Sequence, residues 1–380
     1  MLRRNIRILY LIRFATACIP AYVIERLFWE QRGMTIQDVI YAEIVFALTL
    51  VVLEIPFGLM VDRFGRKMGM IIGTLFECLS FIVLLHAFSL SSFLIAMVLA
   101  GIGTAAISGT EDALLYESMQ QTGAGDRFEQ TVGRMNAVGL GTAGGAALMG
   151  AWLAQSFDLI THYYMSFCFL VCAVLASCLL SDTHSAPQST ERTNDSGWYR
   201  LVKNPSFLRI VSFTVMFGTT ITFLDEFWQL YVRDQGIAVS WFGIILISLM
   251  MAQGIGNLLP KPTGPCTVLC YLLLLYMSGI LLLAVMDGSW SLLVLIGIFL
   301  IYGWSEPVLT TLLQDCLPDE RRATGSSTVS FVESLATMAV GLGFGHISQA
   351  IGLNGAYFYL GLTGLLLGLG MMFVLRIRGK

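Results

Sequence analysis

Charged side chains are scarce in this sequence. Only 12% of its 380 residues are Asp, Glu, Lys or Arg, about half the share of a soluble domain. It also has no His-x-x-x-His pair, no Cys-x-x-Cys pair, no Gly-x-Ser-x-Gly elbow and no basic segment long enough to be a domain. These absences exclude the common constellations of metal-dependent and hydrolytic enzymes and a nucleic-acid partner. We therefore expect neither an enzyme nor a cofactor.

The eight cysteines do not form a recognisable framework. Cys168, Cys172 and Cys178 share one apolar run, and Cys266 and Cys270 share another. Small apolar residues inside helices are the simplest interpretation, ahead of disulfides or a metal site.

Long apolar runs are what the sequence has in abundance. Hydrophobic residues make up 56% of it, and its mean hydropathy is +0.75. About 20 apolar residues of helix cross the roughly 30 Å of hydrocarbon in a bilayer. The sequence predicts an all-α polytopic membrane protein with twelve transmembrane helices, at 6–28, 37–60, 67–89, 91–117, 129–155, 160–181, 206–232, 239–260, 265–286, 290–314, 323–349 and 355–376.

The chain divides into two similar halves. Residues 1–181 and 205–380 each hold six of the predicted spans, and the polar stretch 182–204 between them is typical of a cytoplasmic linker. The first span ends in "LFWEQRGM" and the seventh in "LYVRDQGI", while "GAGDRFEQTVGRMNAVGLG" before the fifth resembles "LPDERRATGSSTVSFVESL" before the eleventh. A direct repeat of six helices predicts a substrate site between the halves, near the middle of the bilayer.

Basic residues lie on one side of the predicted spans. With a cytoplasmic N-terminus, all of the 22 Lys and Arg residues fall on the cytoplasmic side except Arg26, Arg32 and Arg233. This bias predicts a multi-pass protein of the cell membrane, inner or plasma, with both termini in the cytoplasm. The expected partners are the lipid bilayer, protons and a small-molecule substrate, and we expect a monomer.

The connection between the second and third spans, "GLMVDRFGRK", holds one acid and three bases. It follows the pattern Gly, three residues, Asp, Arg or Lys, one residue, Gly and two bases, with Gly58, Asp62, Arg63, Gly65, Arg66 and Lys67. This loop, between spans of a twelve-span chain in two halves, resembles the signature of the major facilitator superfamily. The resemblance implies the fold of that family and transport by alternating access, with two halves that rock about a central cavity.

The bases of this loop fix topology whatever else they do, but topology explains neither Asp62 nor the glycines. Gly58 can admit a neighbouring helix, and Gly65 can supply a tight turn. Asp62 can accept hydrogen bonds from the start of the eleventh span, "RRATGSS". The resemblance implies that this contact holds the cytoplasmic side closed in the outward-open state.

The resemblance also implies an acid beside Arg63 or Arg66, with Asp112 and Glu117 as candidates. Other family patterns are absent: Met97 replaces the Arg that precedes a Gly-x-Gly in many fourth spans, and "GLGTAGGAALMG" lacks the Gly-Pro end of drug antiporters. The segments "EIPFG" and "SGTEDALLYES" nonetheless resemble bacterial efflux-type members.

Ionisable residues inside spans are the main functional candidates, since each costs at least about 2.5–3.5 kcal/mol to insert. Acids outnumber bases there, and carboxyls without a counter-charge can carry protons. Because the family's first, fourth, seventh and tenth spans line its cavity, the resemblance favours as proton or substrate residues Arg13, Glu111, Asp112, Asp225, Glu226 and Glu306, with Glu333 as a further candidate. Glu54 is interpreted as a brace of the loop, while Glu43 and Glu77 are as easily structural as functional.

The seventh span carries the most informative acids, in "TFLDEFWQLY". Adjacent Asp225 and Glu226 lie about 100° apart on a helix, so at most one of them faces a cavity squarely. The aromatic residues around them are candidate cavity residues for a lipophilic cation, namely Phe223, Phe227, Trp228 and Tyr231. An aromatic belt at the outer membrane surface explains the same residues equally well.

The sequence therefore predicts a secondary active transporter that exports a small amphipathic compound, drug-like or metabolite-like, with the proton gradient as energy source. Proton-coupled uptake of a nutrient is the main alternative, supported by the missing proline of the fifth span. A membrane receptor or scaffold without transport is a second alternative, although a static scaffold has no need of a state-dependent latch.

Overall fold

The computed structural model of this chain describes residues 2–108, 110–121, 123, 127–182, 205–260, 265–316 and 322–378. Within these ranges the chain is almost entirely helical and contains no strand. The predicted all-α class is confirmed. The chain groups into two compact units, residues 1–190 with 239–244 and residues 191–238 with 245–380.

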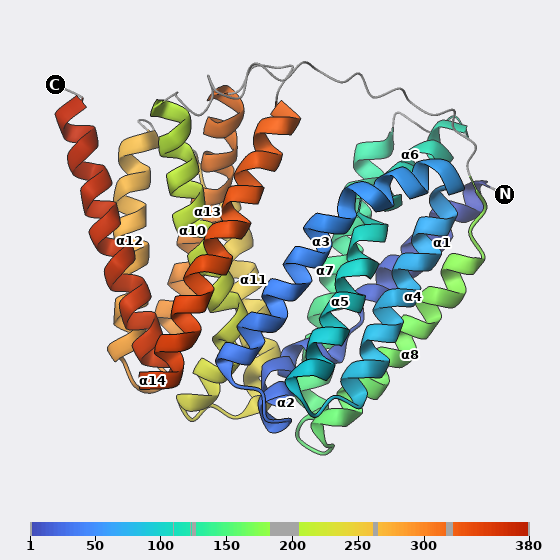
Figure 1. Ribbon diagram of the computed structural model, residues 1–380, viewed down its shortest axis with the longest axis horizontal. Coiled ribbons are helices and arrows are strands. Elements are labelled where there is room, and N and C mark those ends of the chain that lie inside the picture. Colours follow the sequence, from blue (N-terminus) through green and yellow to red (C-terminus); the bar gives the residue numbers. More distant parts are fainter. Residues whose placement is uncertain are drawn as a thin grey trace. The chain divides into compact units, whose positions relative to one another are not determined.

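The first unit packs its helices around α4 and α1. It consists of α1 (Leu2–Ala17), η1 (Pro20–Ile24), α2 (Glu25–Gln31), α3 (Ile36–Phe64), α4 (Arg66–Leu85), α5 (Leu90–Ile107), α6 (Thr110–Gln121), α7 (Phe128–Leu153) and α8 (Leu159–Cys178), with η3 (Val239–Trp241) grouped beside them. α4 packs on α5 and α8, and α1 packs on α6, α7 and α8 (Figure 1). Gly73 of α4 and Gly103 of α5 lie where these two helices touch. A Cβ on Gly73 would lie 3.0 Å from the backbone oxygen of Gly103, and a Cβ on Gly103 would lie 2.9 Å from that of Gly73. Small residues at such positions let membrane helices approach closely.

The second unit is built on two pairs of packed helices. Its elements are α10 (Pro205–Asp234), most of α11 (Phe242–Leu258), α12 (Pro265–Val285), α13 (Ser291–Cys316) and α14 (Arg322–Arg378). Both α10 and α12 pack against α13 and α14.

Several predicted spans are interrupted or joined. The first run breaks after Ala17, and Pro20, which has no N–H to donate, begins the 3-10 turn that leads into α2. The fourth run breaks between Ile107 and Thr110, so that α5 and α6 are separate helices. α14 joins the two last predicted spans, with Gly352 at a φ of 81° as the non-helical residue between them.

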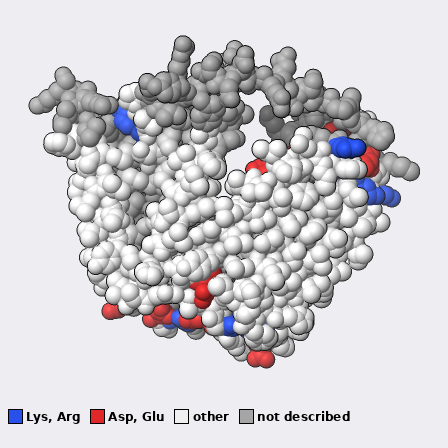
Figure 2. Space-filling model, in the orientation of Figure 1, with Lys and Arg blue, Asp and Glu red and all other residues white. Residues whose placement is uncertain are grey.

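Ten helical segments of the described chain are long and apolar enough to cross a membrane. The prediction of a multi-pass membrane protein is confirmed, but the number twelve stays a prediction. α7 is a helix outside those ten, and the last predicted spans fall in a single segment. Large apolar side chains such as Ile55, Leu258 and Phe373 are exposed, and the face in Figure 2 carries few charged side chains between its upper and lower margins.

Candidate functional site

The loop "GLMVDRFGRK" turns from α3 into α4 at Gly65. This residue has a φ of 96°, in the left-handed region that favours glycine, and a Cβ there would overlap the carboxylate of Asp182. That carboxylate accepts a hydrogen bond from the backbone N–H of Lys67 at 3.3 Å, where the start of α4 favours an anion. Gly65 therefore supplies both the expected tight turn and the room for Asp182.

Gly58 and Asp62 lie on the last turns of α3. A Cβ at Gly58 would meet no atom within 4 Å, so the close helix approach expected there does not occur among the described residues. The side chain of Asp62 lies outside the described part of the chain, as do the side chains of the expected partner segment "RRATGSS", residues 321–327. The latch between them stays a prediction.

One base of the loop finds an acid. Arg66 Nε lies 3.5 Å from Glu117 Oε1, and Glu117 is one of the two partners that the resemblance implies. Arg63 is exposed, with its guanidinium 5.6 Å from the centre of the Phe64 ring. The loop therefore contacts the C-terminal half of α6 through Glu117 and the segment after α8 through Asp182.

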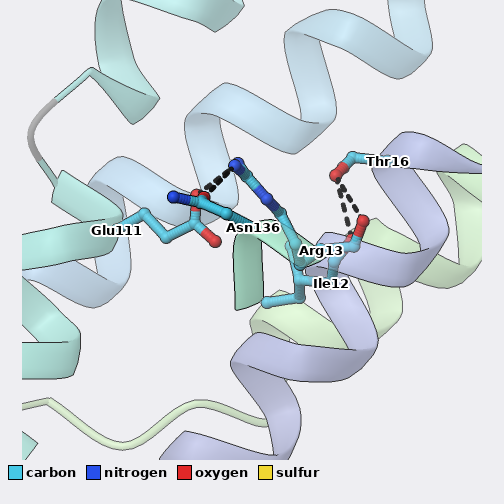
Figure 3. Close-up of polar contacts among 5 residues, drawn as sticks. All are labelled: Ile12, Arg13, Thr16, Glu111 and Asn136. Carbon is cyan, nitrogen blue, oxygen red and sulfur yellow. Dashed lines mark hydrogen bonds and ion pairs between the residues drawn. The ribbon is translucent and has the colours of Figure 1, made fainter. Parts of the chain in front are cut away.

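A pocket of about 220 Å³ lies in the first unit, among residues of α1, α6 and α7 and the end of α5. Arg13 Nη1 donates to Glu111 Oε2 at 3.3 Å, and Arg13 Nη2 donates to Asn136 Oδ1 at 2.9 Å (Figure 3). Asp112 adds a second carboxyl, and the apolar lining comes from Ile107, Leu115, Val132 and Met135. One guanidinium from α1 thus meets polar groups of two other helices.

Space for the guanidinium comes from Gly139 on α7. A Cβ at this position would lie 3.1 Å from Arg13 Nε. The side chain of Arg13 is 38% exposed and that of Glu111 is 16% exposed. Arg13 is therefore the more accessible member of the ion pair.

Glu77 on α4 lies close enough to Glu111 to interact with it electrostatically. Each carboxyl has one buried oxygen, Oε2 of Glu77 and Oε1 of Glu111, without a hydrogen-bond partner among the described residues. A buried polar atom in this state costs about 1–3 kcal/mol. A proton on either carboxyl turns an acceptor into a donor and removes the repulsion between the two charges.

A second pocket, of about 300 Å³, lies in the second unit between α10, α13 and α14. Glu306 and Glu333 both line it, together with Tyr302, and the three interact electrostatically. Gln253 Nε2 donates to Glu306 Oε2 at 3.4 Å. The described lining of this pocket includes no Lys, Arg or His.

Glu333 reaches this pocket because α10 has a glycine opposite it. A Cβ at Gly218 would overlap the Glu333 carboxylate. Hydroxyl and amide groups complete the polar lining, from Thr214, Thr310, Gln314 and Ser330. The second-unit pocket is therefore acidic and polar but has no described counter-charge.

The two pockets occupy matching places in the repeated halves. Aligning "GAGDRFEQTVGRMNAVGLG" with "LPDERRATGSSTVSFVESL" pairs Met135 with Val329, Asn136 with Ser330 and Gly139 with Glu333. All of these except Gly139 line a pocket, and Gly139 makes room for Arg13. Residues at matching positions of the sequence repeat therefore also occupy matching positions around the two pockets.

The fourth and tenth predicted spans can be compared by aligning them on their acids. Aligning Glu111 with Glu306 also pairs Ile107 with Tyr302 and Leu115 with Thr310, and all six residues line a pocket. The base has no such counterpart: aligning "LFWEQRGM" with "LYVRDQGI" sets Arg13 against Met216. The acid is thus common to both pockets and the arginine belongs to one.

The aromatic residues of the seventh predicted span pack inside the second unit and do not line its described pocket. They are all at least nine-tenths buried, namely Phe223, Phe227, Trp228 and Tyr231. Phe223 and Phe227 stack on Phe344 with ring centroids 4.8 and 5.7 Å away. The lipophilic-cation lining expected from these rings is therefore not formed among the described residues.

The neighbouring acids are placed differently from each other. Asp225 is exposed and interacts electrostatically with Tyr302 of the second-unit pocket, while Glu226 is half-buried. This difference agrees with the expected 100° offset on the helix. Asp225 is thus the member of the pair nearer to a described pocket lining.

Reasoning from the sequence missed four residues that shape the pockets: Asn136, Gly139, Gly218 and Tyr302. None of them carries a formal charge, so a search for charges inside spans passes over them. The repeat was the available signal, because it pairs Gly139 with Glu333 and places Asn136 one helical turn before Gly139.

Solved structures of similar fold include several transporters. The nucleoside transporter NupG matches with a TM-score of 0.69 and 12% identity, over 100% of this chain and 99% of that one. A D-xylose-proton symporter matches with a TM-score of 0.69 and 12% identity, over 97% and 96%. A POT family transporter in complex with 5-aminolevulinic acid has a TM-score of 0.68 and 11% identity, over 97% and 96%. At such identities the likeness shows the fold alone.

Sequence comparisons agree with this fold. An "Uncharacterized transporter" from Buchnera aphidicola subsp. Schizaphis graminum (strain Sg) is 25% identical over 134 residues, which is 34% of this chain and 32% of that protein. The chain thus matches about a third of that relative's length. The profile of the Major Facilitator Superfamily matches residues 8–341, which is most of the chain. The chain therefore belongs to the Major Facilitator Superfamily.

Proposed function

We propose that this transporter couples the movement of a small amphipathic molecule to protons, and that Glu306 and Glu333 carry the proton. One observation carries the proposal: two carboxyls line one pocket of the second unit, and the described lining supplies no base. Alternating access, with both termini cytoplasmic, is the transport cycle that the family and the charge pattern support.

Two carboxylates that share a membrane pocket cannot both stay ionised without cost. Like charges repel more strongly where the dielectric is low, and each charge in a span is itself expensive. One proton shared by Glu306 and Glu333 removes the repulsion between them. Tyr302 and Gln253 can then donate hydrogen bonds to the carboxylate that stays ionised. Such a pocket changes its protonation as its access to water changes.

Export of the substrate is the direction that the sequence predicts, from its efflux-like motifs. Uptake by symport is the second candidate, supported by the missing proline of the fifth predicted span. The direction of proton movement separates the two, because symport carries protons with the substrate and antiport carries them against it.

Proteoliposomes loaded with a pH-sensitive dye test the proposal. Organic anions, organic cations, sugars and nucleosides are added outside one at a time, and active compounds are then tried on variants. We expect the double variant Glu306→Gln/Glu333→Gln to lose about 100-fold or more of the substrate-dependent proton flux. Acidification of the interior indicates uptake by symport, and alkalinisation indicates export by antiport.

Two further variants sharpen this experiment. Asp315→Asn on α13 removes an exposed acid outside the pocket and is expected to leave the flux unchanged. Asp225→Asn/Glu226→Gln tests the pair in the seventh predicted span as the alternative proton site. Normal flux in the Glu306/Glu333 double variant, together with lost flux in the Asp225/Glu226 variant, would show that the proton is carried by the acids of α10 and not by Glu306 and Glu333.

A further inference from the structure

The first-unit pocket contains a feature that proton coupling in the second unit does not use. Arg13 lines the first-unit pocket, and the described linings of the two pockets include no other Lys, Arg or His. A guanidinium in a span stays charged. Resting on the proposed transport function, we propose that Arg13 and Asn136 bind the carboxylate of an organic-anion substrate, which replaces Glu111 on the guanidinium as Glu111 takes up a proton.

The geometry leaves Arg13 able to accept a new partner. Its contacts to described residues, Glu111 and Asn136, use two of the five N–H donors of a guanidinium. The bond to Glu111 is 3.3 Å long, whereas charge-assisted N–H···O bonds are about 2.7–2.9 Å. A planar fork with unused donors fits a carboxylate, which it can bind with two parallel hydrogen bonds.

The charges of the pocket link this binding to a proton. Arg13 with ionised Glu111 and Asp112 gives an excess of negative charge, so that an anion alone is repelled. Once a proton neutralises Glu111, the substrate carboxylate meets Arg13 without that competitor. The anion and the proton enter together, so the net charge of the pocket does not change.

Glu111 is suited to take the proton. Its Oε1 is buried without a hydrogen-bond partner among the described residues, as is Oε2 of nearby Glu77. The titratable groups around Glu111 are Arg13 from α1, Asp112 on α6 itself and Glu77 from α4. On the other two helices packed against α6, Arg134 of α7 is exposed and α5 has no titratable residue.

The size of the pocket limits what it can hold. Its volume of about 220 Å³ is below the roughly 300–1,000 Å³ of sites for drug-sized ligands. The apolar residues that share the lining, such as Ile107 and Met135, suit a short hydrocarbon or aromatic group beside the carboxylate. The inferred substrate class is therefore a small amphipathic monocarboxylate or the carboxylate end of a longer molecule.

Thermal unfolding of the purified full-length protein tests this inference without a transport assay. The probes are acetate, lactate, benzoate and phenylacetate, each compared with its primary amide at constant ionic strength. At about pH 5.5 we expect at least one carboxylate to raise the unfolding midpoint with about tenfold or more higher affinity than its amide. At about pH 7.5 we expect that affinity to fall about tenfold or more, because binding takes up one proton.

Variants assign the effect to the two residues. Arg13→Gln is expected to abolish the preference for the carboxylate, and Arg13→Lys to retain part of it, because an ammonium keeps the charge without the fork. Glu111→Gln is expected to bind the carboxylate more tightly and with little dependence on pH. Arg134→Gln, which removes an exposed arginine of the same unit, is the control and should behave like the unmodified protein.

The outcomes also separate this inference from the proposed function. Equal effects of acids and amides, or an unchanged preference in Arg13→Gln, overturn the carboxylate site even if proton flux depends on Glu306 and Glu333. A carboxylate preference that is lost in Arg13→Gln, together with normal proton flux in Glu306→Gln/Glu333→Gln, supports the carboxylate site and overturns only the proposed proton site.

Discussion

The pocket of the first unit and the pocket of the second unit use the same scaffold with different charges. Glu111 of the fourth predicted span and Glu306 of the tenth each line the pocket of their own unit. In the first unit an arginine pairs with that acid, and in the second unit another acid, Glu333, lies near it. The repeat thus preserves the position of one carboxyl and reverses the charge of the group beside it.

The reversal depends on two glycines. Gly139 makes room for a long side chain from α1, and at its matching position stands Glu333, for which Gly218 of α10 makes room. The charged group therefore enters from the first helix of the first unit and from the eleventh predicted span in the second. A guanidinium paired with an acid suits anion binding, whereas two neighbouring acids suit proton binding.

Glu333→Arg is expected to have the largest effect, because it makes the second-unit pocket resemble the first. An arginine beside Glu306 would pair with it and keep it ionised, and removal of one partner from a buried pair costs about 3–5 kcal/mol. Substrate-dependent proton flux into proteoliposomes should fall about 100-fold or more. Asp315→Arg, a similar change at an exposed position of α13, is the control. Flux at the control's level in Glu333→Arg would show that the second pocket does not need its acidic character.

Substitution of the two glycines by alanine should have an intermediate effect and an unequal one. Gly218→Ala forces the Glu333 carboxylate aside, and a misplaced reacting group can lower a rate about tenfold or more. Gly139→Ala asks Arg13 to move only slightly, so we expect carboxylate affinity to fall about twofold. Flux and the unfolding midpoints of both proteins are the measurements.

Matched alanine variants control for helix propensity. Gly133→Ala on α7 and Gly297→Ala on α13 add a Cβ where no atom lies within 4 Å, and each should stabilise its helix by up to about 1 kcal/mol. If Gly139→Ala impaired its pocket more than Gly218→Ala, the glycines would not have the roles assigned to them.

The smallest expected effect comes from the matched residues Asn136 and Ser330. Asn136→Ala removes a hydrogen bond of Arg13 and should weaken carboxylate binding by about 1 kcal/mol, or about fivefold. Ser330 lines the second-unit pocket, where the described lining has no arginine to hold. Ser330→Ala should therefore leave carboxylate binding unchanged. Titrations of benzoate into the two variants, followed by thermal unfolding, compare them directly. Equal losses would mean that the two pockets do not divide the work by charge.

Much of the fold was predictable because a bilayer permits few solutions. The apolar runs locate helices well, and Gly65 was rightly expected at a tight turn. The breaks at Pro20 and between α5 and α6 were not predicted, since the apolar runs continue across them. Hydropathy depends only on the composition of a segment, so it does not indicate where the backbone departs from helical geometry.

The candidate site residues were predictable as a group, but which of them contact each other was not. Arg13 and Glu111 were both expected to matter, but they are 98 positions apart in the chain, and nothing in the sequence joined them. The aromatic residues near Asp225 were interpreted equally well as a cavity lining or as an aromatic belt. In the structure Phe223 and Phe227 pack against Phe344 and are buried.

The sequence by itself determined the class of protein, the helical segments, the repeat and the set of ionisable residues inside the membrane. These properties follow from local composition and from the high cost of placing charge in hydrocarbon. Only the tertiary structure decided that Glu111 meets an arginine while its counterpart Glu306 meets an acid. That outcome depends on the rotation of each helix about its axis and on the space left by Gly139 and Gly218, and both are set by packing between segments distant in the sequence.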